Sequence, residues 1–150
     1  MSERPHLRQR ALQLLTRRDY SRAELEARLA AEAESAEQLA AVLDALQGER
    51  LLSDPRYAAQ RVSARGGRYG NLRLRQELRE KGVGDEDIAT ALLTGGDEQE
   101  RCRAVWARKF GVLPDNAKER ARQTRFLEYR GFSGAAIRSL MGRATAGADE

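Results

Sequence analysis

Residues 69–83, YGNLRLRQELREKGV, carry the pattern from which the architecture follows, because a shift of 49 residues matches them to two other stretches. Residues 20–34 read YSRAELEARLAAEAE, and residues 118–132 read KERARQTRFLEYRGF. The first two stretches share leucines at their sixth and tenth positions, and a separation of four residues places two side chains on one face of an α-helix. The chain is therefore predicted to repeat a helical unit three times.

A second apolar pair follows each stretch at the same 49-residue interval. The pairs are Leu39 with Leu43, Ile88 with Leu92, and Ile137 with Met141. With one preceding helix in each unit, the pattern predicts nine helices in three repeats, at approximately 7–50, 54–95 and 97–143, and a frayed tail at 144–150. A three-helix unit of this size buries little apolar surface alone, so the repeats are expected to stack as an all-α solenoid.

Short polar residues and glycines mark the helix ends. Ser21, Ser35 and Ser133 are predicted to cap helix N-termini, and Gly82 and Gly131 suit the left-handed residue that ends a helix. Asp54 is predicted to cap the first helix of the second repeat, with Pro55 at its first position. One position breaks the apolar pattern: Gln123 stands where the first two repeats have Leu25 and Leu74.

Composition limits the class of protein. The 150 residues suit a single domain, and 33% charged with only 5% aromatic residues favours an elongated helical protein. Cys102 is the only cysteine, so an intrachain disulfide is not possible, and a cytoplasmic location is expected. No apolar run approaches the roughly 20 residues of a transmembrane helix, so no membrane association is expected.

Charge is distributed unevenly along the chain. Residues 19–50 carry eight acidic and three basic residues, a local net charge of −5. The local net charge is +5 for residues 61–81 and +6 for residues 101–130. Local patches of this kind, more than the total of +4, attract an anionic partner. The second and third repeats are therefore the predicted binding region.

Basic side chains at helical spacing supply the candidate contacts. Arg61, Arg65 and Arg68 follow i, i+4, i+7 spacing, and like charges so placed slightly destabilise an isolated helix. Arginine binds carboxylate and phosphate alike, so spacing does not separate a protein partner from a nucleic acid. The full candidate set is Arg61, Arg65, Arg68, Tyr69, Arg75, Arg79, Lys81, Lys118, Arg122 and Arg125.

Signatures of catalysis are weak in this sequence. His6 is the only histidine, so a Ser-His-Asp triad or a site with several histidines cannot be assembled, and no cofactor or metal is expected. Cys102 is predicted to be a small buried apolar residue. The loop at 66–70, GGRYG, lacks the Gly-Lys-Ser/Thr ending of a P-loop and is predicted to be a flexible turn or a mobile arginine-bearing contact loop. Asp85, Glu86 and Asp87 are predicted to form the acidic first turn of a helix and not a metal cluster.

Three segments together resemble the RecX family of regulators of the RecA recombinase, over nearly the whole chain. They are LTRRDYSRAELEARL (15–29), LLSDPRYAAQRVSARGGRYGNLRLRQELREKGV (51–83) and KFGVLPDNAKERARQTRFLEYRGF (109–132). The residues of the central signature are Asp54, Tyr57, Ala58, Arg68, Gly70, Arg75, Gln76, Glu77, Leu78, Lys81, Gly82 and Val83. The sequence departs from the family pattern at Pro55 and Gln123.

The resemblance implies a curved array of three-helix repeats that binds the groove of a RecA filament on single-stranded DNA. It also implies inhibition of RecA ATP hydrolysis, strand exchange and filament growth, without a cofactor and without catalysis by this chain. We expect a monomer that contacts RecA and single- or double-stranded DNA. The alternative is a helix-turn-helix-like protein that reads a DNA sequence without RecA, since small trihelical units with basic helices do so.

Overall fold

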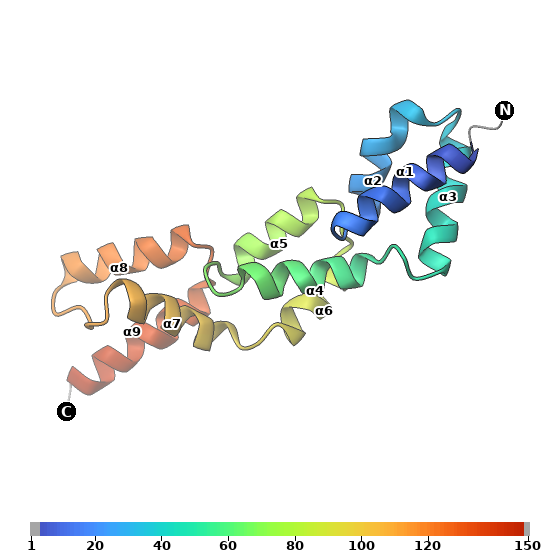
Figure 1. The fold of residues 1–150 in the computed structure, drawn as a ribbon. Coiled ribbons are helices and arrows are strands. Elements are labelled where there is room, and N and C mark those ends of the chain that lie inside the picture. Colours follow the sequence, from blue (N-terminus) through green and yellow to red (C-terminus); the bar gives the residue numbers. More distant parts are fainter. Residues whose placement is uncertain (1–3, 149–150) are drawn as a thin grey trace. The chain divides into compact units, whose positions relative to one another are not determined.

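The computed structural model describes the backbone of residues 4–148 and the side chains of residues 6–142. These residues form nine α-helices and contain no β-strand, which confirms the all-α prediction (Figure 1). The helices are α1 (Arg4–Arg17), α2 (Arg22–Leu29), α3 (Ala36–Gly48), α4 (Asp54–Arg65), α5 (Asn71–Glu80), α6 (Asp85–Thr94), α7 (Glu98–Lys109), α8 (Ala117–Tyr129) and α9 (Gly134–Ala148), and a short 3-10 helix (Ala30–Glu32) follows α2. None of the helices in the described part is long and apolar enough to cross a membrane.

Most predicted helix ends are confirmed. Ser21 caps α2 in a capping box, since its hydroxyl accepts the Glu24 N–H and the Glu24 carboxylate accepts the Ser21 N–H. Ser35 caps α3, since its hydroxyl accepts the Gln38 N–H, and Ser133 caps α9 by accepting the Ala136 N–H. Gly82 and Gly131 have φ angles of 79° and 87°, the left-handed conformation that favours glycine.

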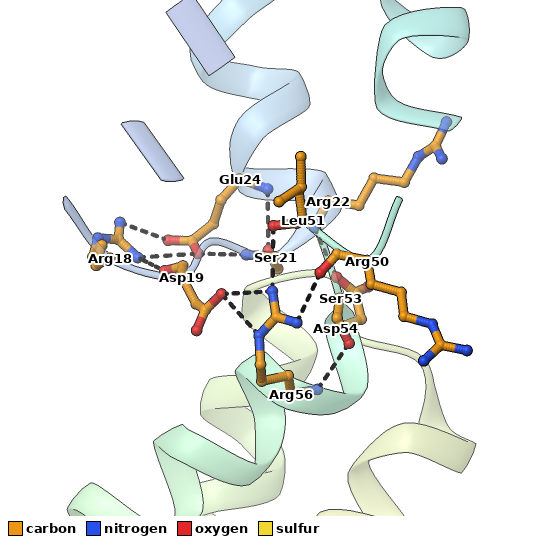
Figure 2. A network of polar contacts seen from close by, with 10 residues as sticks. All are labelled: Arg18, Asp19, Ser21, Arg22, Glu24, Arg50, Leu51, Ser53, Asp54 and Arg56. Carbon is orange, nitrogen blue, oxygen red and sulfur yellow. Dashed lines mark hydrogen bonds and ion pairs between the residues drawn. The ribbon is translucent and has the colours of Figure 1, made fainter. Parts of the chain in front are cut away.

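The predicted cap at Asp54 is wrong. The Ser53 hydroxyl accepts the Arg56 N–H, so Ser53 caps α4 and Pro55 lies one position further into the first turn, where its missing N–H is tolerated. The Asp54 carboxylate instead accepts the N–H of Arg22 at 2.8 Å, at the start of α2. Figure 2 shows Asp54 beside Ser53 and Arg22, below the capping box of Ser21. Asp54 thus joins the first two repeats.

The chain divides into two compact units, and each of them contains a part of the second repeat. The N-terminal unit comprises residues 1–60 and 78–90, and the C-terminal unit comprises residues 61–77 and 91–150. In the N-terminal unit, α1, α2 and α3 enclose a core that includes Leu7, Leu25, Leu29 and Leu43. The 49-residue pattern thus correctly predicted the buried leucines of the first repeat.

The core of the C-terminal unit lies among α7, α8 and α9, with Phe132 and Leu127 fully buried. Gln123 is also buried, and the polar atoms of its side chain form hydrogen bonds. Its side-chain oxygen accepts the Trp106 indole N–H at 2.8 Å, and its amide nitrogen donates to the Val112 carbonyl at 3.0 Å. The residue that breaks the apolar repeat is therefore a satisfied core residue.

Two hydrogen bonds to backbone carbonyls join equivalent positions, 49 residues apart. In the N-terminal unit the Ser21 hydroxyl donates to the Lys81 carbonyl at 2.6 Å. In the C-terminal unit the equivalent residue, Gly70, donates its backbone N–H to the Arg130 carbonyl at 2.8 Å. Each bond joins the start of the second helix in one repeat to the end of the second helix in the next. The repeat therefore extends to the contacts by which neighbouring repeats stack.

The register is kept by some helices and lost by others. The third helices α3, α6 and α9 begin at intervals of 49 residues, whereas α7 begins only 44 residues after α4. The predicted register without gaps holds for the buried positions of the second helices as well, because Leu29, Leu78 and Leu127 are all buried at 49-residue intervals. Helix α8 begins one turn earlier than the repeat requires, but it ends in register with α5. Helix α9 continues to Ala148, through most of the segment predicted to be a frayed tail, and residues 149–150 lie outside the described residues.

Candidate functional site

The glycine-containing loop at residues 66–70 is held by hydrogen bonds to its backbone. Arg101 on α7 donates to the carbonyl oxygens of Gly66 at 3.1 Å and Tyr69 at 2.9 Å, and it also contacts the Asn71 side chain. Arg108, two turns further along α7, donates to the Gly67 carbonyl at 2.5 Å. Instead of a flexible turn, the loop is a fixed support for Arg68 and Tyr69.

Three guanidinium groups surround the ring of Tyr69. The guanidinium carbons of Arg73, Arg65 and Arg130 lie 4.4, 4.6 and 5.6 Å from the ring centroid. Contacts of a cation with an aromatic face at these distances are attractive. Tyr69 therefore gathers arginines from α4, α5 and the end of α8 in one place, although the three groups repel one another.

Glu77 on α5 compensates part of this positive charge. Its carboxylate accepts two hydrogen bonds from Arg65, both at 2.7 Å, and lies 3.5 Å from Arg73. Burial, the largest single effect, opposes ionisation of Glu77. The hydrogen bonds and charge of Arg65, the charge of Arg61 and the hydrogen bond of Arg73 together outweigh it and lower the pKa of the carboxyl below its ordinary value of 4.5. The partner of Arg65 lies twelve residues further along the chain, on the next helix, so spacing within one helix does not reveal this ion pair.

A groove of about 700 Å³ opens beside Tyr69 and is referred to below as the Arg68 groove. Basic groups reach it from the loop, from α7 and from the end of α8. Among the described residues that line it, none is acidic. Its charged and aromatic lining residues are Arg68, Tyr69, Arg108, Lys109, Phe126 and Arg130.

The ring of Phe126 repeats the arrangement seen at Tyr69. Lys109 lies 5.3 Å and Arg130 5.0 Å from its centroid. The Arg68 groove is thus positively charged and contains two aromatic rings, a surface that can bind carboxylate or phosphate groups.

Sequence reasoning found two of these lining residues, Arg68 and Tyr69, and missed four. Arg108, Lys109 and Arg130 were counted in the basic stretch 101–130 but were not included in the candidate set. Their positive charge was visible in the sequence. Spacing along the chain, however, does not show that α7 and the end of α8 lie close together. Only the packing of α7 against α8 and of the loop against Arg101 brings them together.

The other predicted contacts lie elsewhere. Arg61 and Arg75 are half-buried on α4 and α5, and Lys118 and Arg125 are exposed on α8. Arg122 pairs with Glu119 at 3.0 Å and lies over the ring of Phe110.

Arg79 and Lys81 belong to the N-terminal unit, where they pair with Asp85 at 3.1 Å and Glu24 at 3.7 Å. The partner of Arg79 lies on α6 and not on its own helix.

The thiol of Cys102 is unreactive at neutral pH. Cys102 is fully buried, and burial raises its pKa to about 11, so the thiol stays protonated at neutral pH. The prediction of a small buried core residue is confirmed. Asp85, Glu86 and Asp87 form the first turn of α6, also as predicted.

Comparison with known proteins identifies the family. Family models described as the second and third three-helix domains of RecX match residues 53–92 and 97–141. A protein named regulatory protein RecX from Chromobacterium violaceum is 44% identical over 149 residues, covering 99% of this chain and 95% of the relative. The chain belongs to the RecX family. A protein of the same name from Pseudomonas fluorescens is 46% identical over 139 residues, covering 90% of this chain and 89% of the relative.

Solved structures show the same fold. A crystal structure of RecX from Lactobacillus salivarius superposes with a TM-score of 0.82 at 19% identity, over 94% of this chain and 96% of the other. Another crystal structure, of a regulatory protein RecX, superposes with a TM-score of 0.78 at 23% identity over 94% of this chain and 73% of the other. The family assignment predicted from the three sequence segments is confirmed, and with it the repeated three-helix fold.

Proposed function

We propose that this RecX-family chain is a non-catalytic regulator that binds RecA filaments on single-stranded DNA. In this proposal it inhibits RecA ATP hydrolysis, strand exchange and filament growth. Membership of a family whose relatives are named regulatory proteins supports a regulatory role. The proposed partner and its inhibition follow from the resemblance of the sequence segments to that family.

The positive charge of the Arg68 groove is the structural observation that supports this proposal. A RecA filament on DNA offers carboxylates on protein and phosphates on nucleic acid, and guanidinium groups bind both. Arg68 and Lys109 are exposed at the groove, whereas Arg101 and Glu77 hold its loop and its arginines in place. We assign partner contact to the exposed cations and a positioning role to the two supporting residues.

A binding comparison tests this proposal. The labelled protein is titrated with RecA-coated single strands, with RecA alone, with bare single strands and with duplex DNA. We expect much tighter binding to the coated strands than to any single component. Equal or tighter binding to one particular duplex sequence would instead support the helix-turn-helix-like alternative.

Paired variants test the assigned groove. Arg68→Glu with Lys109→Glu reverses two exposed charges in the groove, and we expect it to weaken filament binding by at least about tenfold. Arg103→Glu with Arg138→Glu makes the same change in net charge at exposed positions of the same unit outside the groove. Equal weakening by both pairs would reject the groove as the contact surface.

A further inference from the structure

A second basic groove lies in the N-terminal unit, between α1 and α2, and is referred to below as the Arg17 groove. It has a volume of about 460 Å³ and is lined by Arg10, Gln13, Leu14, Thr16, Arg17 and Arg28. Four of these positions, 10, 13, 14 and 17, form one face of α1 at i, i+3, i+4 and i+7 spacing. Arg28 reaches the groove from α2. Three guanidinium groups therefore line one small depression, around the buried side chain of Leu14.

The three arginines are unequally paired. Arg10 donates to Glu32 at 3.2 Å and to the Gln13 side chain at 3.1 Å, so it is partly neutralised and fixed in place. Arg17 and Arg28 are exposed, and neither forms an ion pair with an acidic group of the described residues. The groove therefore holds two cations whose charge is not compensated there.

Helix dipoles account for only part of this arrangement. Arg17 and Arg28 lie in the last turns of α1 and α2, where a cation stabilises a helix C-terminus. That effect does not require the two side chains to share a groove with Arg10, where like charges repel. Glu32 offsets the charge of Arg10, but the approach of Arg17 and Arg28 to the same groove is unfavourable unless a further anion joins them.

We propose that the Arg17 groove binds a short acidic segment of a polypeptide partner, through carboxylates held by Arg17 and Arg28. The surrounding charge favours this occupant over nucleic acid. The acidic residues lie on the α2 side of the groove, where Arg28 is flanked in sequence by Glu24, Glu26 and Glu32, whereas α1 carries no acidic residue. Charges interact over about 8 Å at physiological ionic strength. A long phosphate backbone would meet that negative surface, whereas a segment with two or three carboxylates needs only the groove.

The test uses nuclear magnetic resonance of the full ¹⁵N-labelled chain titrated with hexaglutamate at low salt. Hexathymidylate of similar charge is the comparison probe. We expect hexaglutamate to shift amide signals of residues 10–17 and of Arg28, and to bind these residues more tightly than hexathymidylate. Preferential binding of hexathymidylate at the groove, or absence of shifts at these residues, would overturn the proposal.

Charge-matched variants separate the groove from general attraction. Arg17→Gln with Arg28→Gln should weaken hexaglutamate binding by about tenfold. Arg50→Gln with Arg103→Gln removes the same charge from exposed positions outside the groove and should leave the affinity within about twofold. Equal weakening by both pairs would reject the site. This site shares no residue with the Arg68 groove, so its failure would leave the proposed function intact.

Discussion

Gln123 is a polar residue at a position that the repeat reserves for leucine, and it is 2% exposed. Its side chain satisfies the indole N–H of Trp106 and the carbonyl of Val112, which lies in the α7–α8 loop. A pattern of apolar residues cannot predict such an exchange, because the partners lie 17 and 11 residues away and do not follow helical spacing. The sequence showed the irregular position but not its cause.

Replacing Gln123 by leucine should destabilise the protein, although it restores the apolar repeat. The change leaves the part-buried Trp106 N–H without its partner, which costs about 1–3 kcal/mol. Val112 is exposed, so water can replace the lost hydrogen bond to its carbonyl. Urea unfolding of Gln123→Leu measures the loss. In a Trp106→Phe background, which lacks the indole N–H, the same substitution should cost less. A stabilised Gln123→Leu protein would contradict this account of the residue.

Glu77 should make stability depend on pH. Its folded-state pKa lies below its ordinary value of 4.5, so its contribution is present at pH 7 and is lost as pH falls through the folded value. Glu77→Gln should therefore cost about 1–2 kcal/mol at pH 7 and less at pH 3. Urea unfolding at both pH values tests this, with Glu128→Gln at an exposed position of the same unit as the control. An equal cost at both pH values would rule out the charge of Glu77 as the cause.

At the scale of the elements, helices were predictable where their signals are local. The correctly predicted helix ends act within one turn of the residues they cap, so spacing along the chain revealed them. They are Ser21 with Glu24, Ser35, Gly82 and Gly131. Ser53 was missed because Asp54 is an equally good cap by residue type. Asp54 is used instead by α2, 32 residues away, and no local pattern reports such a contact.

The junction of α5 with the end of α8 depends on the absence of a side chain at Gly70. A Cβ atom there would lie 2.3 Å from the Cα of Phe132 and 2.4 Å from the carbonyl oxygen of Gly131, and backbone atoms cannot move aside cheaply. Gly70→Ala should therefore destabilise the C-terminal unit by about 1–3 kcal/mol or more.

Gly67 provides the matched control in the same loop, because a Cβ atom there would meet nothing within 4 Å. Thermal unfolding should show a clear decrease in Tm for Gly70→Ala and little change for Gly67→Ala. Similar Tm values for both variants would show that the close contact at Gly70 is not needed for stability.

At the scale of the whole molecule, repetition and charge were visible in the sequence, and the binding surface was not. The 49-residue interval predicted a repeated helical unit and the buried apolar pairs of the second and third helices, because periodic burial leaves a periodic apolar pattern. The buried residues of the first helices have no such repeat. Residues from a loop, from α7 and from the end of α8 line the Arg68 groove. Arg65 is not available for partner contact there, because it is paired with Glu77. Such a surface depends on packing between repeats, which single-helix spacing does not contain.

The central claim is that this chain restrains RecA through the Arg68 groove. The most direct measurement is RecA ATP hydrolysis on single-stranded DNA with increasing amounts of this protein. We predict a progressive decrease in hydrolysis with the unaltered chain, and hydrolysis close to that of RecA alone with Arg68→Glu and Lys109→Glu together, at unchanged helical content. Unchanged hydrolysis at an equal molar ratio of the unaltered chain, or full inhibition by the charge-reversed variant, would contradict the claim.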